Sequence, residues 1–307
     1  MTRVVNLAQH NLIMSYIRDT QTRVQDTQIQ MASGYKSQTY SGIAPDARQL
    51  LNLASSKARI DQYQTNNKTV DLRLQTMETS TAQVIDAATQ LKTLLTNALN
   101  ASNANDLAVG TQAQNLLNEV AKQLNVKIGD RYLFAGSKTD TAPINLSAPG
   151  YSAPPTVYPS VADTGYYQGD SVVMTTRAAD DYDLSYGVTA NDPAFEKIIR
   201  ALQLTATVTT TPTLDRDRLQ DALTLATDAI GGLTTIRSGI GANQNALEAT
   251  NENHADMSTY MDQSIIDITS VDVTEAASRV AQDQLMLQAS YMTISQLSQL
   301  SLANYLR

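Results

Sequence analysis

The chain has 307 residues, and its 22 Lys and Arg against 30 Asp and Glu give a formal net charge of −8. Such an acidic chain is repelled by nucleic acid and by anionic membranes, so neither is an expected partner. The absence of cysteine excludes disulfides, thiolate metal sites and cysteine nucleophiles, and two histidines are too few for a three-histidine zinc site.

Proline and aromatic residues divide the chain into three parts. Residues 129–193 hold 6 of the 8 prolines and 8 of the 16 Tyr and Phe. Proline breaks helices, and aromatic side chains favour pleated surfaces. We therefore expect helical flanks on either side of a middle part made of turns and short strands.

The first flank contains a long heptad pattern. From position 53 to position 98, mostly apolar residues recur at steps of three and four without a break. This 3.5-residue period predicts a helix over 47–99 that packs against a partner helix in a left-handed coiled coil. At 1.5 Å per residue the helix would be about 80 Å long. Pro45 and Asp46 suit its first turn, because proline fits there and a carboxylate complements the helix dipole.

The heptad stripes also contain polar residues, among them Asn67. One interpretation is a tolerated or partly exposed position. The other is that Asn67 sets the register, because a buried Asn penalises pairings that leave its amide without a partner.

Short strands are expected in the middle part. We interpret residues 166–170, 171–177 and 183–186 as short strands between turns. We interpret this part as a small β-rich domain inserted between two halves of a helical rod.

The second flank begins with Asp192 and Pro193, a good N-cap followed by proline at the first helical position. A second heptad pattern runs from position 219 to position 268, interrupted by glycines that favour close packing or bending. Asp272 and Glu275 are typical of a capping box, and they predict a last helix that runs to about residue 305.

The expected fold is mainly α. It is a long antiparallel helical coiled-coil bundle built from both chain ends, with a small β-rich domain inserted in the middle. The expected parts are an N-terminal assembly helix and turn (1–44), the first half of the rod (45–139), the inserted β-rich domain (140–192), the second half of the rod (193–270) and a C-terminal assembly helix (271–307).

No sequence pattern indicates catalysis. The chain contains no nucleotide-binding glycine loop, no H-E-x-x-H zinc motif and no G-x-S-x-G nucleophile elbow. Asp180, Asp181 and Asp183 lack the spacing of a calcium loop, and His10 and His254 lie in different flanks without neighbouring ligands. We expect no catalytic residue, no cofactor and no metal site.

Both chain ends are amphipathic. Their apolar stripes could pair within one molecule, or they could be buried against other subunits. The second interpretation makes the ends an assembly interface, and the candidate residues are Val5, Leu12, Ile13, Ile17, Leu287, Tyr291, Ile294, Leu297, Leu300 and Leu302.

Four segments resemble a known family. Residues 129–136 read Gly-Asp-Arg-Tyr-Leu-Phe-Ala-Gly, which is similar to a signature of the flagellar hook–filament junction proteins, the third hook-associated proteins of the flagellin-like family. Residues 287–306 resemble the C-terminal tail of that family. Residues 29–36 and 237–248 are similar to segments shared with flagellins. The matched motif positions are Gly129, Tyr132, Leu133, Phe134 and Gly136.

Two positions depart from the family pattern. Flagellin-like proteins often carry an acidic pair before the proline that opens the second helix, whereas this chain has Ile43 and Ala44 before Pro45. Arg307 extends beyond the usual terminal leucine.

The resemblance implies a structural role. Such a protein is exported unprocessed through the flagellar secretion channel to the extracellular flagellum. It forms a ring or short tubular layer with copies of itself, on the preceding hook-associated protein, and flagellin polymerises beyond it. A flagellar export chaperone is a further implied partner. The alternatives are a flagellin, a secreted coiled-coil adhesin, or a hydrolase with a coiled-coil arm. The hydrolase is disfavoured because residues 129–193 contain neither His nor Cys.

Overall fold

A computed structural model describes the backbone of residues 2–100, 108–151, 157–209 and 214–305, and the side chains of these ranges apart from 2–9 and 297–305. The chain divides into two units, which are residues 60–256 and the combination of 1–59 with 257–307. The long helices α2 (Ala44–Asn100) and α5 (Arg216–Thr269) contribute to both units. These two helices confirm the two long helices that the heptad patterns predict.

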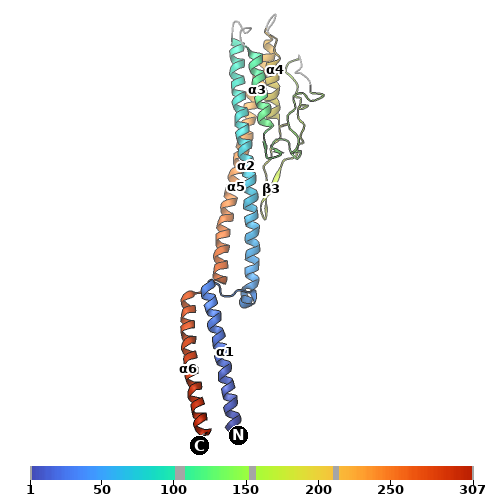
Figure 1. The fold of residues 1–307 in the computed structure, drawn as a ribbon. Helices are drawn as coiled ribbons and strands as arrows, with labels where there is room; N and C mark the ends of the chain where they lie inside the picture. Colours follow the sequence, from blue (N-terminus) through green and yellow to red (C-terminus); the bar gives the residue numbers. More distant parts are fainter. Residues whose placement is uncertain (1, 101–107, 152–156, 210–213, 306–307) are drawn as a thin grey trace. The chain divides into compact units, whose positions relative to one another are not determined.

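The unit of residues 60–256 is built around a helical core. Helices α3 (Val109–Leu124) and α4 (Pro193–Ala206) lie side by side, and both pack with α2 and α5 around one hydrophobic cluster (Figure 1). Its largest fully buried side chains include Leu74, Leu91, Phe134, Tyr166 and Phe195. The sequence interpretation did not separate α3 from the first half of the rod.

A local signal defines the start of α4, and a glycine of α5 allows the two helices to pack closely. The side chain of Asp192 accepts a hydrogen bond from the backbone N–H of Ala194 at 2.9 Å, which confirms the expected N-cap before Pro193. Gly232 of α5 faces α4 closely, since a Cβ there would lie 2.7 Å from the Cβ of Ala194. Close packing therefore explains Gly232. At Gly231, Gly239 and Gly241 the added Cβ would meet open space among the described residues.

The middle part forms two antiparallel hairpins and long irregular loops. Strands β1 (Lys127–Ile128) and β2 (Arg131–Tyr132) pair with each other, as do β3 (Thr175–Ala179) and β4 (Tyr182–Ser185). The first hairpin was not expected from sequence. The strand expected at 166–170 is wrong apart from an isolated bridge between Tyr167 and Ile144, and residues 171–174 belong to neither sheet.

The other unit is formed by the chain ends. Helices α1 (Thr2–Ser33) and α6 (Val273–Tyr305) run antiparallel and lie side by side (Figure 1). A short 3₁₀ helix, η1 (Tyr40–Ile43), precedes α2. Asp272 caps α6, because its carboxylate accepts from the N–H groups of Thr274 and Glu275 at 2.8 and 3.1 Å. The expected fold class is thus confirmed: the protein is mainly α, its helical bundle is built from both chain ends, and a small β-containing segment lies in the middle.

Candidate assembly surface

Helices α1 and α6 meet along a narrow seam. On α1 the residues that face inward follow steps of four and three, and the most buried are Ile17, Thr20, Val24 and Thr27. On α6 the inward residues are Ala276 and the half-buried Val280, Asp283, Leu287, Ser290 and Ile294. This spacing is that of a coiled coil, so one stripe of each helix is used within the pair.

Polar contacts fix the pairing of the two helices. The guanidinium of Arg23 lies 2.9 Å from the carboxylate of Asp283, and the side-chain amide of Gln21 donates to the hydroxyl of Tyr291 at 2.6 Å. Both contacts join residues that are about 260 to 270 positions apart in the chain. They therefore set which turn of α1 faces which turn of α6.

Helix α6 has a second apolar stripe that nothing in the described chain covers. Leu285 is 65% exposed and Met292 is 68% exposed, and each lies two positions from the nearest seam residue, on the opposite side of the helix. Met286 is 50% exposed, and residues 284–306 contain no charged side chain. A helix that is apolar on two opposite sides is typical of burial on both sides.

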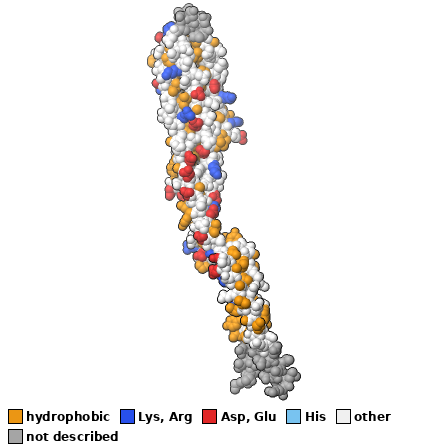
Figure 2. Space-filling model, turned by 90° about the vertical axis from the view of Figure 1, so that its left-hand side faces the viewer, with side chains coloured by type: hydrophobic (Ala, Val, Ile, Leu, Met, Phe, Trp, Pro, Cys, Tyr) orange, Lys and Arg blue, Asp and Glu red, His pale blue; other side chains and the backbone are white. Residues whose placement is uncertain are grey.

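Helix α1 also has exposed apolar side chains. Leu12 and Tyr16 are 54% and 61% exposed, and they lie one turn apart. Figure 2 shows hydrophobic side chains gathered over the described part of these two helices. We call five of the exposed apolar residues of the pair the outer face, namely Leu12, Tyr16, Leu285, Met286 and Met292.

The structure separates the predicted interface residues into three groups. Ile13, Ile17, Leu287 and Ile294 lie in the seam between α1 and α6, whereas Leu12 and Tyr291 are exposed. The side chains of Val5, Leu297, Leu300 and Leu302 lie outside the described residues. Sequence reasoning did not single out Tyr16, Met286 and Met292, although residues 284–306 contain no charged side chain.

The family motif at 129–136 serves the core of the other unit. Gly129 and Gly136 have φ values of +59° and +69°, which favour glycine. Phe134 is fully buried and meets Phe195 of α4 edge to face, with ring centroids 5.7 Å apart. Leu133 is also buried, and Tyr132 is half-buried in β2. This motif therefore anchors the start of the inserted segment to α4.

Asp170 closes the same turn from the other side. Its carboxylate accepts from the backbone N–H and the hydroxyl of Ser137 and from the N–H of Val172. These hydrogen bonds, those from Ser137 first, lower the pKa of Asp170. A Cβ at Gly136 would collide with Asp170, so only glycine fits there.

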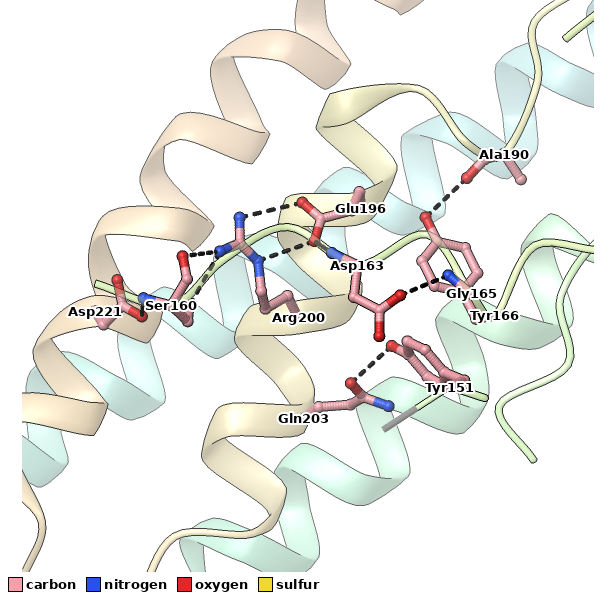
Figure 3. A network of polar contacts seen from close by, with 10 residues as sticks. All are labelled: Tyr151, Ser160, Asp163, Gly165, Tyr166, Ala190, Glu196, Arg200, Gln203 and Asp221. Carbon is pink, nitrogen blue, oxygen red and sulfur yellow. Dashed lines mark hydrogen bonds and ion pairs between the residues drawn. The ribbon is translucent and has the colours of Figure 1, made fainter. Parts of the chain in front are cut away.

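A buried polar network holds the loop before Tyr166 onto α4 (Figure 3). Arg200 and Glu196, one turn apart on α4, form an ion pair at 2.9 Å and are almost inaccessible to solvent. Arg200 also donates to the backbone carbonyl and the hydroxyl of Ser160, and Glu196 accepts from the N–H of Asp163 at 3.2 Å. A buried ion pair needs such additional partners to offset its desolvation.

Two tyrosines complete the network as hydrogen-bond donors. The Tyr151 hydroxyl donates to Gln203 at 2.7 Å, and the Tyr166 hydroxyl donates to the carbonyl of Ala190 at 3.0 Å. Burial, followed by nearby carboxylates, raises the pKa of both hydroxyls well above the ordinary value. They therefore remain protonated, and the network positions a loop.

Asn67 lies where α2, α5 and the β3–β4 hairpin meet. It is fully buried, and its amide nitrogen donates to the backbone carbonyl of Ala178 at 3.1 Å and to the side chain of Asn251 at 3.0 Å. The His254 ring nitrogen Nε2 lies 2.9 Å from the same carbonyl, and the ring stacks on Tyr63. Whether Asn67 sets a helix register stays a prediction; its contacts attach the hairpin to both helices.

The acidic residues of the hairpin do not form a metal centre. Within the described residues, no group of three or more His, Asp and Glu side chains is arranged to hold a metal ion. Asp180 instead accepts a hydrogen bond from the Tyr63 hydroxyl at 3.0 Å. In the described ranges, no helix is both long and apolar enough to cross a membrane.

Two family models match the chain. The bacterial flagellin N-terminal helical region matches residues 4–139, and the bacterial flagellin C-terminal helical region matches residues 223–306. A curated relative, flagellar hook-associated protein 3 of Escherichia coli (strain K12), is 24% identical over 291 residues, which are 89% of this chain and 90% of that protein.

Solved structures share the fold. A candidate flagellar hook-associated protein from Vibrio parahaemolyticus has a TM-score of 0.61 at 19% identity, over 75% of this chain and 100% of that one. The flagellar junction protein FlgL from Legionella pneumophila has a TM-score of 0.52 at 15% identity, over 71% of this chain and 99% of that one.

Proposed function

Because the chain belongs to the bacterial flagellin family, whose N- and C-terminal helical regions both match it, we propose that it is a structural subunit of the flagellum in the layer that joins hook to filament. In this role it packs with copies of itself on the preceding hook-associated protein, and flagellin polymerises beyond it. It reaches the flagellum unprocessed, through the flagellar secretion channel with an export chaperone. It performs no catalysis.

The outer face of the α1/α6 pair carries this proposal. Leu285 and Met292 are exposed on the side of α6 opposite the seam, so α6 has apolar surface left after it has paired with α1. A soluble subunit with an uncovered apolar stripe on its terminal helix gains stability when neighbouring subunits cover that stripe. In the proposed layer, copies of the chain cover one another's outer faces.

Immunogold labelling of isolated flagella tests the proposal. A narrow band of label at the boundary between hook and filament is the expected result. Label along the whole filament would identify the chain as a flagellin, and absence of label from flagella would contradict both roles.

Paired variants connect the outer face to this role. Leu285→Gln with Met292→Gln removes two large apolar side chains, while Gln288→Ser with Thr293→Ser changes neighbouring exposed polar positions. In a strain that lacks the native protein, the first pair is expected to release filaments into the medium and the second to retain them. Equal retention by the two pairs would show that the outer face plays no part in attachment.

A further inference from the structure

The α1/α6 pair joins the rest of its unit through two short linkers that run next to each other. Helix α1 ends at Ser33 and is followed by Gly34, while α5 ends at Thr269 and α6 begins at Val273. We define the paired joint as residues 34–36 together with residues 269–271. One linker enters the pair and the other leaves it.

Backbone hydrogen bonds tie the two linkers together. Tyr35 and Ser270 form an antiparallel bridge. On either side of this bridge, the N–H of Lys36 donates to the carbonyl of Thr269 at 2.7 Å, and the N–H of Val271 donates to the carbonyl of Gly34 at 2.9 Å. The two segments thus form a minimal two-stranded sheet from residues more than 230 positions apart.

Side chains of the joint also close the adjacent helix ends. The ammonium group of Lys36 donates to the carbonyl of Asp267 at 2.6 Å, in the last turn of α5. The side-chain amide of Gln30, in the last turn of α1, donates to the carbonyl of Lys36 at 2.8 Å. Helix ends leave several carbonyls unpaired, and Lys36 supplies a charged donor where the helix dipole favours a cation.

The joint is held by hydrogen bonds with little packing. None of its six residues is fully buried, and Tyr35 is 52% exposed. Bending at such a place disturbs few apolar contacts. Separating the linkers, in contrast, breaks both backbone hydrogen bonds and uncovers two helix ends.

We infer that the two linkers act as one unit, so that the α1/α6 pair bends as a single body about the paired joint, with Lys36 as the residue that fastens it. The two linkers remain bonded to each other during this motion. In a subunit that joins two structures, such a joint allows bending while α1 and α6 keep their mutual register.

A disulfide across the bridge tests whether the linkers stay together. Tyr35 and Ser270 occupy a non-hydrogen-bonded antiparallel pair, whose Cα atoms lie about 4.5 Å apart, within the range that a disulfide spans. The chain has no native cysteine, so Tyr35→Cys with Ser270→Cys can form only this intramolecular bond. The single variants Tyr35→Cys and Ser270→Cys are the matched controls.

We expect the full-length double variant to form the disulfide completely under mild oxidation. Cells that carry it should swim equally well before and after a reducing agent opens the bond. Failure to form the bond would show that the linkers are not paired in solution. A loss of motility under oxidation that the reductant restores, and that the single variants lack, would show that the linkers must separate.

Amide hydrogen exchange provides a readout that does not depend on the proposed function, unlike motility. Lys36→Met removes the donor to Asp267, and we expect exchange at the Val271 amide to become faster by about fivefold to tenfold. Lys36→Arg should keep exchange slow, and Lys57→Met, which removes the ion pair with Asp262, should leave the joint unchanged. Equal exchange in all three variants would overturn the role assigned to Lys36.

Discussion

The core of residues 60–256 and the α1/α6 pair have the same heptad spacing, but the spacing leads to different degrees of burial in the two regions. In the core, the stripe of α2 from Leu74 to Ala98 is covered by α3, α4, α5 and the inserted segment, and its apolar members are almost all inaccessible. In the pair, one stripe is covered and a second stripe, with Leu285 and Met292, is exposed. The same pattern therefore completes a fold in one region and leaves apolar surface exposed in the other.

Burial within the chain thus separates two kinds of apolar residue. A residue whose apolar surface is already covered contributes to the free energy of unfolding of the isolated subunit. An exposed apolar residue on a terminal helix contributes mainly when another subunit covers it.

The largest expected effect comes from deleting residues 287–307. This truncation removes more than half of α6, and we expect it to abolish attachment of filament to hook. The melting midpoint of the monomer should change little, because the core of residues 60–256 stays intact. A large drop in the midpoint would show that the chain ends belong to the stable core.

A matched pair of leucine substitutions sharpens the comparison. Leu91→Ala removes a fully buried side chain and should lower the free energy of unfolding by about 2–5 kcal/mol. Leu285→Ala, at a position 65% exposed, should change it by less than about 0.5 kcal/mol. Urea denaturation of both variants measures the two values. Similar losses at both sites would remove the distinction between the regions.

Asn67→Ala should weaken the core moderately. It removes two hydrogen bonds from a buried amide and leaves Asn251 without this donor, so we expect a loss of about 1–3 kcal/mol. Thr69→Ala, at an exposed position on the same helix, is the control and should change stability by less than about 0.5 kcal/mol. Faster amide exchange in the β3–β4 hairpin of Asn67→Ala would locate the loss there.

Asn67→Leu tests the register separately. If Asn67 penalises wrong pairings, the leucine variant should give a broader distribution of assembled products, which electron microscopy can measure. Uniform products would leave only the attachment of the hairpin as its role.

The smallest expected effect is the pH dependence of the turn at Asp170. Since the folded-state pKa of this carboxyl lies below its ordinary value of 3.8, its contribution to stability is present above that value and is lost as the pH falls through the folded pKa. The amide signals of Ser137 and Val172 should therefore move together in an NMR titration between about pH 5 and pH 2. In Asp170→Asn this transition should disappear, and its persistence would assign it to another group.

Local patterns in the sequence predicted most of the helical architecture. The heptad stripes of α2 and α5, the N-cap at Asp192 and the cap at Asp272 depend on residues a few positions apart, and the structure has them as expected. The strand expected at 166–170 failed because pairing needs a partner strand. The segment around Tyr167 finds only an isolated bridge to Ile144.

The sequence pattern did not predict the long-range contacts. Nothing near Asn67 indicates that its partner is a carbonyl 111 positions away in a hairpin, and nothing near Tyr166 indicates that it shares a core with Phe195. At the ends of the chain, periodicity identified apolar stripes but did not separate the seam from the outer face. That separation required knowing that α6 pairs with α1.

The contacts between Gln21 and Tyr291 and between Arg23 and Asp283 also set an order of folding. Each helix can form from its own local hydrogen bonds, but these two contacts need both ends of the chain. Whichever end of the chain emerges first must wait for the other. The α1/α6 pair therefore exists only when both ends of the polypeptide are present. Under the proposed function, a chain that is truncated at either end lacks this pair and is excluded from the junction layer.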